Sequence, residues 1–182
     1  MKTNDLRRIV IIGPECTGKS ELSALLADTY QTVWVKEYAR EYLDQLDRPY
    51  GPDDLKLIAH GQTAHEDAMA MRANKVLICD TDLYVIKVWS NFKYGYCDPE
   101  ILDMIARRRY DLYLLTYIDI PWVSDPLREH PDQREELYAI YLREMENQSV
   151  PFVEVKGNRQ ERRAIATKAI DSLLEHGLVY KG

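Results

Sequence analysis

Short apolar runs alternate along the chain with longer segments in which apolar residues recur every three or four positions. Five of the runs predict buried strands, at residues 9–12, 33–35, 76–79, 112–117 and 152–155. Strands that alternate with helices require crossover connections, which place helices on both faces of a parallel sheet. The pattern therefore predicts an α/β protein with a five-stranded parallel sheet.

The amphipathic segments between these runs predict the helices. The longest is expected from Pro52 to about Ala73, because a proline followed by an acidic residue is typical of a first helical turn. Another helix is expected to open at Pro131, and the rest cover residues 20–30, 82–92, 99–108 and 161–174. Ligands of parallel α/β sheets bind at the carboxyl ends of the strands. The residues that follow each strand are therefore the first candidates for chemistry.

The segment after the first strand fits the phosphate-loop pattern G-x-x-x-x-G-K-S/T in full. Its glycines let several backbone N–H groups point at one phosphate, and the next helix adds its positive N-terminal end. In this pattern Lys19 reaches the β- and γ-phosphates and Ser20 ligates magnesium. Cys16 is either a reactive thiol or a tolerated small residue. Nucleotide contacts are expected from Gly13, Glu15, Cys16, Thr17, Gly18, Lys19, Ser20 and Glu21.

The third strand runs into the acidic segment Asp80-Thr81-Asp82. An apolar strand that ends in aspartate is typical of the magnesium side of a phosphate-loop enzyme, so Asp80 is predicted to serve the metal with Ser20. The alternative for Asp80 is a helix N-cap. Asp82 either caps the following helix or contacts a substrate.

A phosphate loop does not by itself select a reaction. A GTPase would carry N-K-x-D after a strand, and here Asn74-Lys75 precedes one. A motor ATPase generally needs partner domains, for which 182 residues leave little room. Phosphoryl transfer to a small acceptor instead needs a carboxylate for the acceptor hydroxyl, cations around the phosphoryl group and a lid that excludes water.

Each of these three needs has a candidate. Glu37 follows the second strand and should lie beside the phosphate loop with Arg40, unless this segment is only an exposed helix start. Arg128 and Arg134 follow the fourth strand, and Arg134 falls in a first helical turn, where a cation opposes the helix dipole. Either a bound phosphate or a surface salt bridge would explain it. Gln62 shares the apolar side of its helix and needs either a substrate or a backbone partner.

Composition and charge narrow the function classes. The net charge of −6 disfavours nucleic-acid binding, and the basic run at residues 107–109 is expected only to end a helix. Three cysteines without a C-x-x-C pair disfavour a disulfide scaffold or zinc site, and the four histidines are interpreted as structural or solvated. No apolar stretch is long enough to span a bilayer. These features predict a soluble cytoplasmic protein that contacts neither nucleic acid nor membrane.

Six segments of the chain carry a resemblance to a known family, namely the phosphate loop, V-K-E-Y-A-R-E at 35–41, D-T-D at 80–82, K-V-W at 87–89, Pro121-Trp122 with Asp125 and Arg128, and P-D-Q-R at 131–134. Together these segments resemble the nicotinamide riboside kinase domain of NadR-type NAD-salvage proteins, over nearly the whole chain. The resemblance implies a three-layer P-loop NTPase fold of the nucleoside and nucleotide kinase type, with residues 1–182 as one kinase domain and a lid at about 122–135. It also implies ATP-dependent phosphorylation, with Mg²⁺, of the 5′-hydroxyl of nicotinamide riboside.

The resemblance also assigns roles. Glu37 would position or deprotonate the hydroxyl, and Trp122 would either stack on the pyridinium ring or be a plain core residue. Gly157 and Asn158 resemble the loop that lies against adenine. The expected catalytic residues are Lys19, Glu37, Asp80, Arg128 and Arg134. The expected substrate contacts are Glu37, Tyr38, Arg40, Gln62, Asp82, Trp122 and Asp125.

Three positions depart from the resemblance. Val85 and Ile86 stand where threonines are expected, and Pro126 stands where a glycine is expected after the lid aspartate. These changes bear on the acceptor more than on phosphoryl transfer, so a kinase for another nucleoside is an alternative. An ATP-binding regulatory module is an alternative from another class. The adenylyltransferase and DNA-binding parts of NadR-type proteins are absent, so the chain is expected to make the mononucleotide and stop there.

Overall fold

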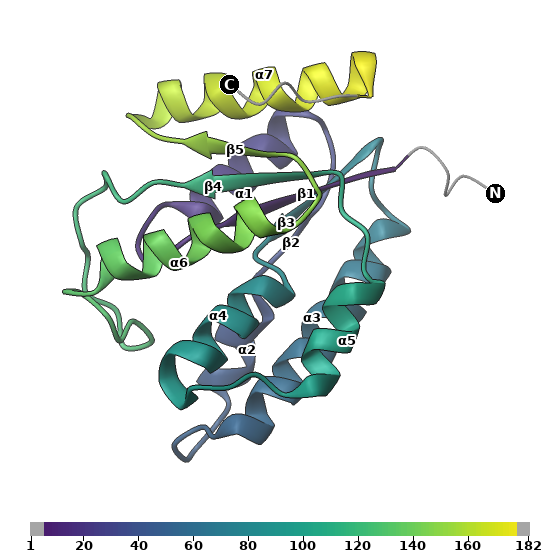
Figure 1. Cartoon of the computed structure of the whole chain (residues 1–182). Helices are drawn as coiled ribbons and strands as arrows, with labels where there is room; N and C mark the ends of the chain where they lie inside the picture. The colour runs from purple at the N-terminus through teal and green to yellow at the C-terminus, as the bar shows by residue number, and fades with distance from the viewer. Residues whose placement is uncertain (1–5, 178–182) are drawn as a thin grey trace.

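The computed structural model describes residues 6–177, which build a parallel sheet between two layers of helices (Figure 1). The sheet has five strands in the order β2-β3-β1-β4-β5, and every neighbouring pair is parallel. The predicted three-layer α/β fold is therefore confirmed. The strands are β1 (Arg7–Ile12), β2 (Trp34–Val35), β3 (Val76–Asp80), β4 (Leu112–Thr116) and β5 (Phe152–Val155).

The helices follow the predicted order with two differences. Residues 38–44 form a separate helix, which the sequence offered only as an alternative. The helix expected to open at Pro131 begins at Arg134, because Gln133 N–H donates to His130 O and Pro131 lies inside that turn. The helices are α1 (Lys19–Thr29), α2 (Tyr38–Asp44), α3 (Pro52–Ala70), α4 (Leu83–Tyr94), α5 (Pro99–Arg107), α6 (Arg134–Asn147) and α7 (Arg159–His176).

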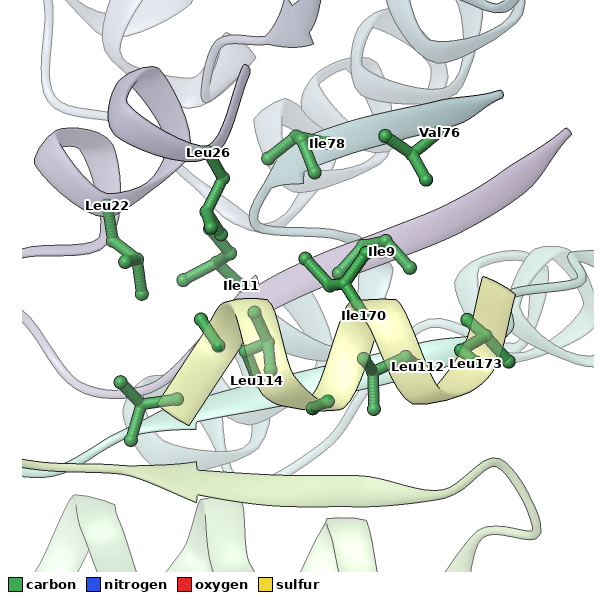
Figure 2. Packing of buried hydrophobic residues seen from close by; sticks show 13 residues of the cluster. Ile9, Ile11, Leu22, Leu26, Val76, Ile78, Leu112, Leu114, Ile170 and Leu173 are labelled. Atoms are coloured by element: carbon green, nitrogen blue, oxygen red, sulfur yellow. The ribbon is translucent and has the colours of Figure 1, made fainter. Parts of the chain in front are cut away.

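Both faces of the sheet are covered, which explains why its strands are apolar without alternation. Ile9 and Ile11 of β1 point toward α1 and α7, where they pack with Leu26 and Ile170 (Figure 2). The alternate residues of the strand, Val10 and Ile12, point to the other face, which packs against α4 and α6. Within residues 6–177, no helix is long and apolar enough to cross a membrane.

A second group of helices extends beyond the sheet. Helices α2, α3, α4 and α5 gather below the sheet in Figure 1 and share their own cluster around Leu55, Ile58, Leu83 and Ile101. Because α2 and α4 directly follow β2 and β3, these two helices begin at the carboxyl edge of the sheet. Residues of both helices line the same cavity as residues 126–130 of the loop that joins β4 to α6.

Candidate active site

The phosphate loop wraps closely against the end of β4. Gly13 has a φ of 145°, and a Cβ there would lie 2.5 Å from the Thr116 hydroxyl oxygen and 2.8 Å from the Thr116 carbonyl oxygen. Only glycine fits this approach. The buried Thr17 hydroxyl lies 2.7 Å from the Thr116 hydroxyl and donates to Pro14 O at 2.8 Å. These contacts fix the loop in the shape that a phosphate cradle requires.

Ser20 and Asp80 meet at the base of this loop. The Ser20 hydroxyl donates to Asp80 Oδ2, while Asp80 Oδ1 is buried and has no hydrogen-bond partner. Burial, and then the negative charge of Glu37, raise the pKa of Asp80 to about 6. A hydroxyl and a carboxylate side by side are oxygen ligands of the kind that Mg²⁺ takes together with substrate phosphates. The pair therefore fits a magnesium ion, and the unpaired oxygen is the atom that the ion would satisfy.

Asp82 lies only two residues further along the chain, but its carboxylate is occupied by hydrogen bonds within the protein. It is fully buried, accepts from Tyr84 N–H at 3.0 Å as the N-cap of α4, and accepts from the Tyr113 hydroxyl at 2.7 Å. Burial raises its pKa to about 7. Of the two alternatives for Asp82, the structure shows the cap.

Gln62 and Tyr38 are likewise occupied by protein contacts. Gln62 accepts from Tyr38 N–H at 2.9 Å and donates to Thr81 O at 3.4 Å, which is the backbone alternative. The Tyr38 ring packs against Gly61 and the His65 ring. None of these side chains lines either of the two cavities that border the phosphate loop. The geometry therefore gives no support to the substrate contacts expected from Tyr38, Gln62 and Asp82.

A large cavity of about 510 Å³ opens beside the phosphate loop. Glu37 and Arg40 line it near the loop, and an aromatic wall of Tyr50, Trp89 and Phe92 lines its far end. Sequence reasoning gave no role to this wall. Trp89 and Phe92 belong to a set on α4 with helical spacing, which on sequence grounds cannot be told from a core stripe. The cavity-lining members of that set are Val85, Val88, Trp89 and Phe92.

Arg40 connects the cavity carboxylate to the β4–α6 loop. Its Nε lies 3.5 Å from Glu37 Oε2, and its Nη1 lies 3.1 Å from Asp125 Oδ2. The other Asp125 oxygen accepts from Leu127 N–H at 2.9 Å. That hydrogen bond, and then the Arg40 guanidinium, lower the pKa of Asp125. Glu37, Arg40 and Asp125 thus form one charged chain, of which Glu37 and Arg40 line the cavity and Asp125 does not.

Two arginines reach the phosphate loop from this side, namely Arg128 of the β4–α6 loop (residues 117–133) and Arg134, the first residue of α6. Arg128 Nη1 lies 3.4 Å from Cys16 Sγ, and Arg134 Nη2 donates to Cys16 O at 3.1 Å. The Nε atoms of both arginines are buried without a hydrogen-bond partner. Trp122 lies about 6.0 Å from the Arg128 guanidinium and 5.9 Å from that of Arg134, outside the cavity lining. Trp122 thus contacts the arginines, which neither alternative for it included.

Further contacts hold this loop over the large cavity. Glu15 of the phosphate loop accepts from the N–H groups of Glu129 and His130 at 3.1 and 3.2 Å. At the far end, the Tyr50 hydroxyl donates to Glu129 at 2.8 Å, and Lys93 also donates to Glu129. The loop therefore spans the cavity from the phosphate loop to the aromatic wall.

A small cavity of about 100 Å³ lies on the other side of the phosphate loop, between α1 and α7. Gly157 and Asn158 line it, as do Leu22, Leu25, Ile120 and Arg162. Its volume is below the roughly 300 Å³ of the smallest typical ligand pockets, so it suits one part of a ligand. Gly18 and Glu21 border both cavities, which places the phosphate loop between them.

Comparison with known proteins places the chain in a family. The model of the family described as an AAA domain matches residues 8–162. The chain belongs to that family. Its sequence is also 30% identical over 166 residues to the trifunctional NAD biosynthesis/regulator protein NadR of Escherichia coli K12. The match to the Salmonella typhimurium NadR is 30% over 159 residues. The resemblance to NadR-type proteins is therefore confirmed, although the chain spans only 40% and 38% of the length of these relatives.

Solved structures agree on the fold. A crystal structure of NadR protein in complex with NR matches 98% of this chain and 54% of its own, with a TM-score of 0.76 and 22% identity. A deoxyadenosine kinase from M. mycoides matches 91% of this chain and 99% of its own, with a TM-score of 0.64 and 14% identity. The fold is thus that of P-loop nucleoside kinases.

Proposed function

We propose that this chain is a kinase that transfers the γ-phosphoryl group of ATP to the 5′-hydroxyl of nicotinamide riboside, giving nicotinamide mononucleotide. The observation that carries the proposal is the pair of cavities on either side of the phosphate loop. A nucleotide laid across the loop puts its base in the small cavity and its γ-phosphate at the mouth of the large one. The large cavity then has room for a second substrate, which a kinase requires and a plain ATP sensor does not.

The residues around the loop divide the work of phosphoryl transfer. The loop amides and Lys19 hold the phosphates, and Ser20 with Asp80 would hold Mg²⁺, which when bound neutralises phosphate charge. Glu37 lines the large cavity and would accept or orient the acceptor hydroxyl. The base would lie against Gly157 and Asn158, as the resemblance implies.

The loop at residues 122–135 is proposed as the lid of a single kinase domain covering residues 1–182. Arg128 and Arg134 bring two cations from this loop to the phosphate loop, and their unpaired Nε atoms can donate to a transferring phosphoryl group. The contacts of the loop with Glu15 and Tyr50 hold it over the cavity, where a closed lid would exclude water and protect ATP from hydrolysis.

The aromatic wall supports a flat acceptor base. Tyr50, Trp89 and Phe92 can stack on a ring, and a pyridinium ring adds cation–π attraction. We therefore assign the stacking role first considered for Trp122 to this wall. The similarity to NadR proteins, one of which was solved in complex with NR, supports nicotinamide riboside as the acceptor.

Two of the three departures line the large cavity, namely Val85 and Pro126, whereas Ile86 is buried in the helix cluster. Residues at these two cavity positions would contact the acceptor or the lid, so a change there can change which acceptor fits. Another nucleoside is therefore the second candidate acceptor.

A coupled assay with ATP and magnesium against a panel of nucleosides tests the proposal. Turnover restricted to nicotinamide riboside is the expected result. Turnover on another nucleoside alone would keep the kinase and reject the acceptor. No turnover with any nucleoside of the panel, while ATP still binds, would favour a regulatory module.

A further inference from the structure

Arg162 of α7 is a buried arginine to which the proposed mechanism gives no role. Only 4% of it is exposed, and one guanidinium holds three backbone carbonyls from separate segments. Its Nη1 donates to Thr17 O of the phosphate loop at 2.6 Å and its Nη2 to Tyr117 O after β4 at 3.0 Å. Its Nε donates to Gly157 O after β5 at 2.9 Å. A single side chain thus ties together the segments around the small cavity.

Asp119 completes this arrangement from the opposite side. It accepts from Arg162 through Oδ1 and from Gly157 N–H through Oδ2 at 2.5 Å. Burial alone would raise the pKa of Asp119, but the Gly157 N–H and then the Arg162 guanidinium hold it below its ordinary value. Both the N–H and the C=O of Gly157 are therefore fixed by the Arg162–Asp119 pair.

The backbone conformation at Gly157 and its close neighbours disfavour any residue with a Cβ at this position. Its φ is 92°, and a Cβ would lie 2.4 Å from Glu161 Oε2. A left-handed glycine held at both its polar groups gives the small cavity a rigid rim. The position of that rim relative to the phosphate loop is set by Arg162, which lines the same cavity.

The contact with Thr17 acts on the phosphate side. A trans peptide is planar, so the carbonyl of Thr17 and the N–H of Gly18 point in opposite directions. Arg162 draws the carbonyl toward itself on the α7 side. The N–H of Gly18 is thereby aimed away from Arg162. Arg162 therefore holds the rim of the small cavity and also sets the orientation of a phosphate-loop amide.

We propose that Arg162 is a positioning residue that couples the base-binding cavity to the phosphate loop, with Asp119 fixing its base-side arm. The inference rests on the proposed function only in taking the ligand to be a nucleoside triphosphate, and it involves no acceptor. The rival explanation is that Arg162 merely fastens α7 to the sheet.

The test compares binding of ATP with binding of inorganic tripolyphosphate, which lacks the base, by calorimetry on the full chain with magnesium. The variants are Asp119→Asn, which weakens only the base-side arm, and Arg162→Lys, which shortens both arms. Arg163→Lys is the matched control, because Arg163 is the exposed neighbour on the same helix. Thermal unfolding of each variant is measured alongside.

Asp119→Asn is expected to weaken ATP about tenfold, the worth of a charge-assisted hydrogen bond, and to leave tripolyphosphate within about twofold. Arg162→Lys is expected to weaken both ligands, ATP more strongly, while Arg163→Lys changes neither. If Arg162→Lys does not fold, the Asp119→Asn comparison decides alone.

A lower unfolding midpoint with both affinities unchanged, or lowered by one common factor, would overturn the coupling and leave a structural arginine. Failure of the native chain to bind ATP would overturn this inference and the proposed function together. The expected binding series without turnover on any nucleoside would overturn the proposed function alone.

Discussion

The two ends of the sheet both bury charged groups, but they treat them differently. At the amino end, Glu66 is fully buried, and Oε2 of its carboxylate accepts from Arg108 at 2.7 Å and from the Tyr110 hydroxyl at 2.9 Å. At the carboxyl end, Asp80 keeps one buried oxygen unpaired, as Arg128 and Arg134 each keep one nitrogen. Among residues 6–177 only one further buried side-chain polar atom lacks a partner, on Arg8, and it lies 3.7 Å from Glu66.

The difference is between buried charges whose atoms are paired by other protein groups and buried charges that keep an unpaired atom. Burying a charge is unfavourable unless hydrogen bonds and an opposite charge offset it. The protein meets this condition by itself around Glu66. Around the phosphate loop a magnesium ion and a triphosphate would meet it, which is why we propose that the unpaired atoms there belong to the reaction site.

The largest effect is expected when the carboxyl end loses Arg128 of the proposed lid. Arg128→Ala should lower turnover by roughly 10³-fold or more, as expected for an arginine that stabilises a transferring phosphoryl group, and should change ATP affinity only slightly. Steady-state kinetics and calorimetry with ATP measure the two quantities. Lost ATP binding with intact turnover would show that the role assigned to Arg128 is wrong.

Asp80→Asn should separate activity from stability. Turnover should fall roughly a hundredfold or more, because the contribution of a metal to transition-state charge is worth several kcal/mol. The pKa of Asp80 is raised in the folded protein, so its charge destabilises the fold above pH 6, and this effect vanishes as the pH falls toward 4.

The neutral amide should therefore raise the free energy of unfolding of the ligand-free protein at neutral pH, by about 1–3 kcal/mol. Denaturant titration without nucleotide checks the sign. A destabilised Asp80→Asn would mean that the carboxylate already has its partners, and the contrast between the two ends would fail.

Glu66→Gln makes the same change at the other end and should have the opposite sign. Burial raises the pKa of Glu66 although Arg108 and Tyr110 lower it, so that pKa alone would give the same sign as at Asp80. The pKa of Arg108 points the other way, because the carboxylates of Asp67 and Glu66 raise it above its ordinary value against burial. We expect Arg108 to decide the sign, because a neutral amide leaves its buried guanidinium short of one opposite charge. Removing one partner of a buried ion pair should reduce the free energy of unfolding by about 3 kcal/mol. The folded fraction should keep its turnover, since Glu66 lines neither cavity. A more stable Glu66→Gln would mean that the charge of Glu66 destabilises the fold, as that of Asp80 is expected to do.

The sequence was sufficient for the fold and for the phosphate end of the site. Apolar strands next to helices of the right period dictate the parallel sheet, and Gly13 and Ser20 take their places because the phosphate loop tolerates little variation. The end of β3 was harder to interpret. Asp80 and Asp82 are both carboxylates at a strand end, and only the fold shows that Tyr113 satisfies Asp82.

The aromatic wall of the large cavity could not be predicted from the sequence, for a related reason. Trp89 and Phe92 follow the spacing of a core stripe, and periodicity does not report whether the partner of an apolar face is protein or cavity. Tyr50 lies in a loop without any motif. Its contacts come from two segments that reach it only after folding, α4 through Trp89 and Lys93 and the β4–α6 loop through Glu129.

The smallest effect is expected at this meeting point, where the carboxyl end is satisfied by protein contacts alone. Tyr50→Phe removes the hydroxyl that donates to Glu129 and accepts from Trp89 Nε1 at 2.9 Å, and it keeps the ring of the aromatic wall. A hydrogen bond to a carboxylate is worth about 1.5 kcal/mol or more, so the acceptor KM should rise about tenfold with kcat little changed. ATP hydrolysis without acceptor should also rise, because the lid closes less firmly. Tyr96→Phe is the control, since Tyr96 is 52% exposed and lines neither cavity. Equal kinetics for both variants would mean that the Tyr50 contact does not hold the lid, and would leave the Glu15 contacts and the two arginines to close it.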